Sequence, residues 1–86
     1  MTIETRVRSY ILENFLFTED QSELDSHDSF LEKGIVDSTG ILEIILFLEE
    51  EFAINVADQE MIPKYLDSVT NIVNFIRGKV NLKEIA

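Results

Sequence analysis

The chain has 86 residues and a mass of 9.9 kDa, with 17 acidic residues against 7 basic ones and a formal net charge of −10. Hydrophobic residues make up 45% of it, which is enough for one compact core and excludes a disordered acidic tail. The absence of cysteine excludes disulfides, thiolate zinc sites and cysteine nucleophiles. We therefore expect a single domain spanning residues 1–86.

The acidity also bears on partners and location. No basic residue occurs between Lys33 and Lys64, so nucleic acid and anionic membranes are unfavourable partners, whereas proteins with basic patches are favoured. The N-terminal segment has no apolar stretch behind a basic start, and the longest apolar runs are too short to span a membrane. We expect a cytoplasmic monomer without a secretory signal.

A helix is predicted over Ile3–Phe17, because its apolar residues recur on one face and Thr2 can cap its start. The following residues, 18–36, are mostly polar and predict a long loop, and loops of this length are often functional. Four apolar residues in its second half are expected to pin the loop onto the core: Phe30, Leu31, Ile35 and Val36.

A second helix is predicted from Ser38 to Phe52. Its apolar arc is wide, which fits either burial on more than one side or partial exposure to a partner protein. Five residues are expected to share one side of it: Leu42, Ile45, Leu46, Glu49 and Phe52. The run Glu49–Glu51 is unusual, because the C-terminal end of a helix favours cations.

The remainder predicts a linker with a short helix, capped by Asp58 and ended near Ile62 by Pro63. A last helix is expected from the cap Ser68 to a stop at Gly78. The sequence therefore predicts an all-α fold, a small four-helix bundle of three long helices and one short helix with a long first loop.

Ser38 is the main candidate for chemistry, since it follows Asp37 where the loop meets a helix. The free N–H groups and the dipole of a helix start favour a phosphate, so a serine hydroxyl there is well placed to carry a phosphoester. Serine is also among the best helix-capping residues, and position alone favours that simpler interpretation.

The neighbouring residues favour the phosphoester. The stretch Phe30–Gly40, followed by Leu42–Ile44 and the Leu-Glu-Glu-Glu-Phe end of Phe47–Phe52, resembles the acyl carrier protein family. Residues 2–7 look like the first helix of that family and residues 68–76 like its last, so the resemblance covers nearly the whole chain. The Asp-Ser pair alone is a weak signal, and its combination with the glutamate run, the acidity and the length is a strong one.

The resemblance implies that a phosphopantetheinyl transferase attaches a 4′-phosphopantetheine arm from coenzyme A to Ser38. The thiol of the arm would then hold an acyl or aminoacyl group as a thioester, so that a cysteine-free phosphoprotein takes part in thioester chemistry without being an enzyme. Implied partners are an acyl or aminoacyl ligase and downstream synthases or transferases of fatty acid or secondary metabolite biosynthesis. The resemblance places these residues on the face presented to partners: Asp37, Thr39, Gly40, Leu42, Glu43, Leu46, Glu49 and Glu50.

Two residues depart from the pattern of the family. Thr39 stands where many carriers have Leu, and Gly40 weakens the first helical turn. The Asp-Ser-Thr-Gly variant looks similar to free-standing carriers that are served by dedicated adenylating ligases. The alternative function is an acidic helical adaptor in which Ser38 only caps its helix.

Other candidate sites are weaker. His27 lies in an Asp-Ser-His-Asp cluster that is more typical of a turn than of a metal site, and residues 20–25 lack the glycine of a calcium loop. We therefore expect neither a metal site nor a catalytic site. Four aromatic residues are expected in the core rather than in a binding site: Phe15, Phe30, Phe52 and Phe75.

Overall fold

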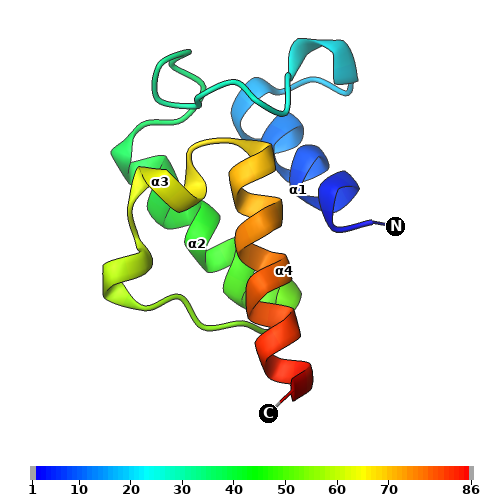
Figure 1. Cartoon of the computed structure of the whole chain (residues 1–86). Coiled ribbons are helices and arrows are strands. Elements are labelled where there is room, and N and C mark those ends of the chain that lie inside the picture. The colour runs from blue at the N-terminus through cyan, green and yellow to red at the C-terminus, as the bar shows by residue number, and fades with distance from the viewer. Residues whose placement is uncertain (1, 86) are drawn as a thin grey trace.

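The computed structural model describes residues 2–85, which form four α-helices and contain no strand (Figure 1). In chain order the elements are α1 (Ile3–Ile11), a π-helical turn η1 (Leu12–Leu16), a 3₁₀ turn η2 (Gln21–Glu23), α2 (Ser38–Phe52), a second 3₁₀ turn η3 (Asp58–Glu60), α3 (Pro63–Leu66) and α4 (Val69–Ile85). α4 packs against α1, and α2 crosses behind α4 in the view of Figure 1. The predicted all-α bundle is confirmed.

The core collects apolar side chains from every part of the chain. α1 contributes Val7 and Ile11, and the loop before α2 contributes Phe30, which is completely buried. The remaining buried hydrophobic residues are Leu12, Leu24, Val36, Ile41, Ile44, Ile45, Leu48, Ile54, Val56, Leu66, Val69, Ile72, Val73 and Ile76. Because apolar burial is the main stabilising term in folding, this one cluster holds the bundle together.

The first helix starts as expected, with the hydroxyl of Thr2 accepting the N–H of Thr5 at 3.1 Å. The α-helical part stops earlier than expected, at Ile11, and continues as a π turn. Side chains five residues apart align in a π turn, and the rings of Tyr10 and Phe15 meet edge to face at 5.9 Å. The turn ends at Phe17, which has a left-handed backbone (φ 54°) and is 83% exposed.

The long loop is held at both of its ends. The Arg8 guanidinium of α1 donates to the carbonyls of Gln21 and Leu24 at 2.9 and 2.6 Å. Beyond them, the N–H of Phe30 donates to the carbonyl of Asp67 at 2.7 Å, just before α4. The prediction that apolar residues pin the loop onto the core is confirmed for Phe30, Val36 and the half-buried Ile35. It is wrong for Leu31, whose side chain is 40% exposed and whose backbone N–H donates to the Asp67 carboxylate.

The second half of the chain corrects three expectations. Pro63 does not end a helix but begins α3, a position that suits proline because the first helical N–H needs no partner. Asp58 is not a cap but the first residue of η3, and Ala57 holds the capping position, where its N–H donates to the Glu60 side chain at 2.9 Å. Gly78 does not stop α4, which continues to Ile85.

The cap of the last helix is confirmed, because the Ser68 hydroxyl accepts the N–H of Asn71 at 3.1 Å. Gly78 therefore lies inside α4, where it is exposed, and a Cβ added to it would meet no atom within 4 Å.

We predict that Gly78→Ala stabilises the protein by about 1 kcal/mol, because alanine loses less backbone entropy in a helix. Thermal unfolding followed by circular dichroism measures the change. Gly34→Ala is the control, because Gly34 has φ +69° and an alanine there is expected to cost about 1–2 kcal/mol. A Gly78→Ala variant no more stable than the wild type would contradict the continuous α4.

Candidate functional site at the start of α2

A tight turn brings the chain out of the long loop and into α2. Gly34 adopts φ +69°, and the carbonyl of Phe30 accepts the N–H groups of Ile35 and Val36 at 2.9 and 3.3 Å. The side chain of Val36 is buried, while Asp37, the next residue, is exposed. The buried Phe30 and Val36 therefore fix where α2 begins.

Asp37, and not Ser38, caps this helix. Its carboxylate Oδ1 accepts the N–H of Gly40 at 2.7 Å, and its carbonyl accepts the N–H of Ile41 at 3.1 Å. Ser38 is the first residue of α2 and is exposed. Among the atoms that the structure describes, its hydroxyl has no hydrogen-bond partner, nor do the N–H groups of Ser38 and Thr39. The capping interpretation of Ser38 is therefore wrong, and its oxygen lies free beside two unpaired donors.

Gly40 has a structural reason to be glycine. A Cβ there would lie 2.6 Å from Cγ1 of Val36 and 3.0 Å from Cε1 of Phe15, closer than van der Waals contact allows. Gly40 is buried against Phe15, so it does not lie on the exposed face on which the family resemblance placed it. The helix-weakening glycine is thus needed for close packing.

A hollow of about 350 Å³ lies at the start of α2 and is lined by Asp37 and Thr39, the two neighbours of Ser38 in the sequence. Its lining combines apolar and acidic residues: Phe15, Gly34, Ile35, Asp37, Thr39, Gly40 and Glu43. Sequence analysis placed Phe15 in the core. The π turn brings it to this rim, half-buried, and no sequence signal identified the turn.

α2 divides its wide apolar arc between the core and the solvent. The buried side consists of Ile41, Ile44, Ile45 and Leu48. Leu42 and Leu46 are 55% and 60% exposed, so they do not share a side with the buried Ile45 as expected. Part of the wide apolar arc is therefore buried in the core, and the two leucines are exposed. With Thr39, Glu43 and Glu50, the two leucines form one exposed strip along α2, called here the α2 face.

The glutamate run is used partly for folding. Glu49 is half-buried, and its Oε2 accepts the N–H of Val56 at 3.1 Å, which ties the linker to the helix. Glu51 pairs with Arg6 of α1. Glu50 is exposed and, among the residues that the structure describes, has no ion-pair partner. Of the three acidic side chains, Glu50 is therefore the one available to a partner protein.

Tyr10 joins α1 to α2 beside this site. Its ring stacks on that of Phe47 with centroids 3.9 Å apart, and its hydroxyl donates to the backbone carbonyl of Glu43 at 3.3 Å. Burial, and to a lesser extent the negative charge of Glu43, raises the pKa of Tyr10 above its usual value. The phenol therefore stays neutral and keeps its hydrogen bond at physiological pH.

The weaker candidate sites are local turns. The carboxylate of Asp25 accepts the N–H of His27 at 2.8 Å, and His27 Nδ1 lies 3.4 Å from the hydroxyl of Thr70. Asp20 accepts both the N–H and the hydroxyl of Ser22, which lowers the pKa of Asp20. Within the described part of the chain no cluster of three or more histidine, aspartate or glutamate side chains is placed to hold a metal ion.

Aromatic residues were expected in the core. Phe30 is completely buried, while Phe15, Phe52 and Phe75 are only half-buried and pack against the core cluster. Among residues 2–85, no helix has the length and apolar character required to cross a bilayer.

Comparison with known proteins decides the family. No protein-family model matches the chain. It is 31% identical over 79 residues to an acyl carrier protein of Chlamydia caviae, covering 92% of this chain and 97% of that one. It is 33% identical over 82 residues to an acyl carrier protein of Buchnera aphidicola subsp. Acyrthosiphon pisum, covering 95% and 96%. The chain belongs to the acyl carrier protein family.

A third relative, an acyl carrier protein of Clostridium acetobutylicum, is 38% identical over 59 residues, which are 69% of this chain and 74% of that one. Members of this family are carriers and not catalysts, so the protein is an acyl carrier and not an enzyme. The resemblance noted in the sequence is confirmed, and so is the fold that it implied.

We predict that Asp37→Ala lowers the free energy of unfolding by about 0.5–2 kcal/mol, because the N–H of Gly40 loses its acceptor. Ser38→Ala is the matched control and is expected to change stability by less than about 0.5 kcal/mol, since it removes no hydrogen bond. Urea unfolding of both variants measures the difference. Equal destabilisation by the two substitutions would contradict the assignment of Asp37 as the cap.

Proposed function

We propose that Ser38 carries a 4′-phosphopantetheine arm, joined through a phosphoester to its hydroxyl oxygen. Bound there, the arm would supply the thiol on which acyl or aminoacyl cargo is held as a thioester. A phosphopantetheinyl transferase would supply the base and the metal for the attachment, so this chain needs no catalytic pair. The observation that carries the proposal is the exposed Ser38 hydroxyl, which has no hydrogen-bond partner within the described residues.

The surroundings of Ser38 fit a phosphoester. Its oxygen stands at the N-terminus of a 15-residue helix, where the dipole and unpaired N–H groups favour a phosphate. The Asp37 carboxylate, the nearest negative group in the sequence, is held by the N–H of Gly40. Because Asp37 caps α2, the hydroxyl of Ser38 can be modified without loss of the cap, and this supports the carrier over the adaptor.

The α2 face is proposed to bind the partner enzymes, together with Asp37. It presents the exposed Leu42 and Leu46 beside the acidic Glu43 and Glu50. An apolar centre with a charged rim is the usual anatomy of a protein interface. The acidic rim would attract enzymes with basic patches, raising the rate of encounter more than the final affinity.

Two of the expected partner residues contribute indirectly to this proposal. Gly40 is buried and allows the first helix to pack close to α2. Glu49 holds the N–H of Val56, so its replacement would disturb the linker as well as the surface charge. Glu50 is therefore the better position at which to test electrostatic steering.

We predict that coenzyme A and a broad-specificity phosphopantetheinyl transferase add one phosphopantetheinyl group to the protein. Intact-mass spectrometry of the wild type and Ser38→Ala measures the addition, which Ser38→Ala should lack. Ser29→Ala is the control for loss of a serine elsewhere and should still be modified. An unmodified wild type, or labelling of Ser38→Ala, would contradict the proposal and favour the adaptor.

We predict that Glu50→Lys lowers the rate at which the transferase modifies the protein by about two- to tenfold at low salt, because it reverses a charge that steers encounter. The measurement is kcat/KM at several ionic strengths, and the deficit should shrink as salt screens the charges. Glu23→Lys is the matched control, as Glu23 is exposed in the distant 3₁₀ turn η2. An equal deficit in both variants would contradict specific steering by the α2 face.

A further inference from the structure

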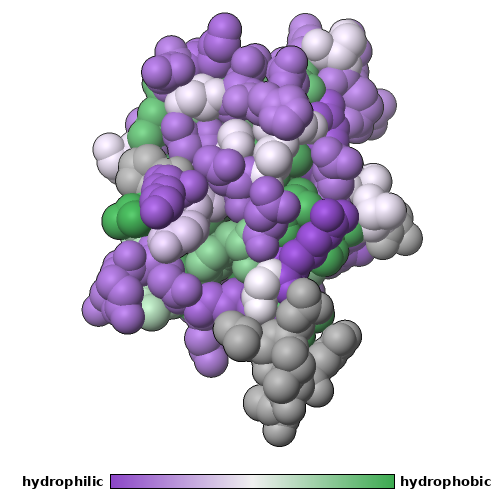
Figure 2. Space-filling model, in the orientation of Figure 1, coloured by the Kyte–Doolittle hydropathy of each residue, from purple (hydrophilic) through white to green (hydrophobic). Residues whose placement is uncertain are grey.

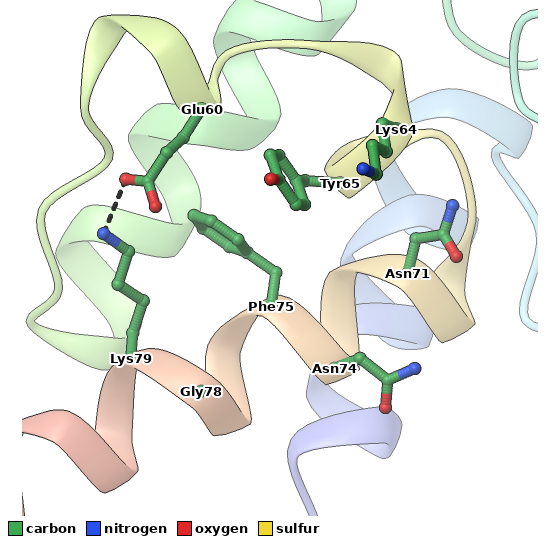
Figure 3. Close-up of a pocket in the computed structure, with 8 residues that line it drawn as sticks. All are labelled: Glu60, Lys64, Tyr65, Asn71, Asn74, Phe75, Gly78 and Lys79. Carbon is green, nitrogen blue, oxygen red and sulfur yellow. Dashed lines mark hydrogen bonds and ion pairs between the residues drawn. The ribbon is translucent and has the colours of Figure 1, made fainter.

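A second hollow lies away from the start of α2, between the turn η3, α3 and α4, and has a volume of about 380 Å³ (Figure 3). It shares no lining residue with the hollow at the start of α2. The face that contains it is largely hydrophilic, with small hydrophobic areas framed by polar side chains (Figure 2). Its size is at the lower end of the range of ligand pockets.

Two aromatic rings form the apolar part of the hollow. Tyr65 of α3 and Phe75 of α4 are both half-buried, and their ring centroids lie 5.7 Å apart with planes tilted by 35°. Gly78 lies one turn along α4 from the phenylalanine and leaves open space where another residue would project a side chain. The two rings and the bare helix turn together offer a surface that suits a flat apolar group.

The charges of the hollow are unusual for this chain. Only 7 residues of the chain are basic, and two of them, Lys64 and Lys79, line this hollow. Lys79 is paired with Glu60 at 2.5 Å, and this hydrogen bond is the main cause of the lowered pKa of Glu60. Lys64 lies over the Tyr65 ring, 5.8 Å from its centroid, and among the described residues it has no carboxylate within ion-pair distance.

The polar groups stand on opposite sides of the rings. In Figure 3 the Glu60–Lys79 pair lies on one side of the two aromatic side chains, and Lys64 and Asn71 lie on the other. The backbone N–H of Asn71 is bound by the Ser68 hydroxyl, but its side-chain amide has no hydrogen-bond partner among the side chains that the structure describes, those of residues 2–62 and 64–80. An ammonium and a side-chain amide on the same side of the rings therefore both lack a partner among the described side chains.

We propose that this hollow binds a small planar carboxylate, whose flat body packs on Tyr65 and Phe75 and whose carboxylate meets Lys64 and Asn71. A single negative charge is preferred, because one lysine is unpaired and the Glu60 carboxylate on the other side would repel a second anionic group. A bound ligand would bridge α3 and α4 and so stabilise the region that joins them. The proposal does not depend on modification of Ser38.

The test is a titration of the ¹⁵N-labelled full-length protein with 2-naphthoate at low salt, followed by NMR. We expect saturable shifts of the amide signals of α3, Asn71, Phe75 and Gly78, and a melting temperature that rises with ligand concentration. Gly78→Leu should weaken binding by at least about tenfold because its side chain fills the hollow. Lys64→Gln should weaken it by about two- to fivefold, the range of an exposed ion pair.

The controls separate the charge from the apolar contact. Lys33→Gln removes an exposed lysine elsewhere and should bind 2-naphthoate like the wild type. The neutral 2-naphthylmethanol should bind the wild type more weakly than 2-naphthoate and should bind Lys64→Gln and the wild type equally. Circular dichroism checks that Gly78→Leu is folded. If Gly78→Leu is unfolded, the proposal is tested by Lys64→Gln, which changes an exposed side chain.

Three outcomes would overturn the proposal: shifts that do not saturate or that centre on the α2 face, equal affinity of Lys64→Gln and the wild type for 2-naphthoate, and tighter binding of the neutral alcohol than of the acid. Each would place the attraction somewhere other than the ring pair and Lys64. None of them bears on the attachment of phosphopantetheine to Ser38, which is read separately by mass.

Discussion

The hydrogen bond from the N–H of Gly40 to the carboxylate of Asp37 is the contact on which the arrangement at the serine depends. Because Asp37 caps α2, the hydroxyl of Ser38 does not bind a backbone N–H of the helix, and it remains exposed at the positive end of the helix dipole. The residue before it, Val36, is buried, so the cap is anchored to the core. The hydroxyl oxygen of Ser38 is thus exposed where α2 begins, and it does not cap that helix.

In this acidic chain, three of the basic side chains connect segments of the fold to one another. Arg6 pairs with Glu51, Lys79 pairs with Glu60, and the Arg8 guanidinium donates hydrogen bonds to carbonyls of the long loop. These basic side chains serve as internal ties between segments distant in sequence. Among the residues that the structure describes, no basic side chain pairs with Glu43 or Glu50, so the α2 face keeps a negative charge whose field extends over a distance set by the ionic strength.

The same chain carries two kinds of surface. The α2 face combines exposed leucines with acidic residues and suits a basic protein partner. The hollow between α3 and α4 combines two aromatic rings with lysine and suits a small anion. The two surfaces share no residue, so a protein partner on one and a small ligand on the other would not contact the same side chains.

The spacing of apolar residues predicted helices correctly where tertiary packing favours the same helix, and both ends of α2 were predicted. It failed where neighbours in space override the local signal. Glycine often ends a helix, yet α4 continues through Gly78. The side chains of Ile72, Val73 and Ile76, which precede it in α4, are buried in the core and stabilise the helix. The π turn of Leu12–Leu16 could not be foreseen, since it is chosen by how the aromatic side chains pack on α2 and not by the propensities of its own residues.

By itself, the sequence determined the helical class, the acidic character, the family and Ser38 as the candidate site, because these depend on residue type and on spacing along the chain. Only the tertiary structure decided that Asp37 is the cap, that Gly40 is buried, and that Glu49 binds the linker while Glu50 stays exposed. The burial of Gly40 depends on the side chain that the first helix places over it, and the choice of Asp37 over Ser38 as the cap depends on where α2 begins. The contact of Glu49 depends on the path of the linker that follows α2, and residue type and spacing do not specify that path.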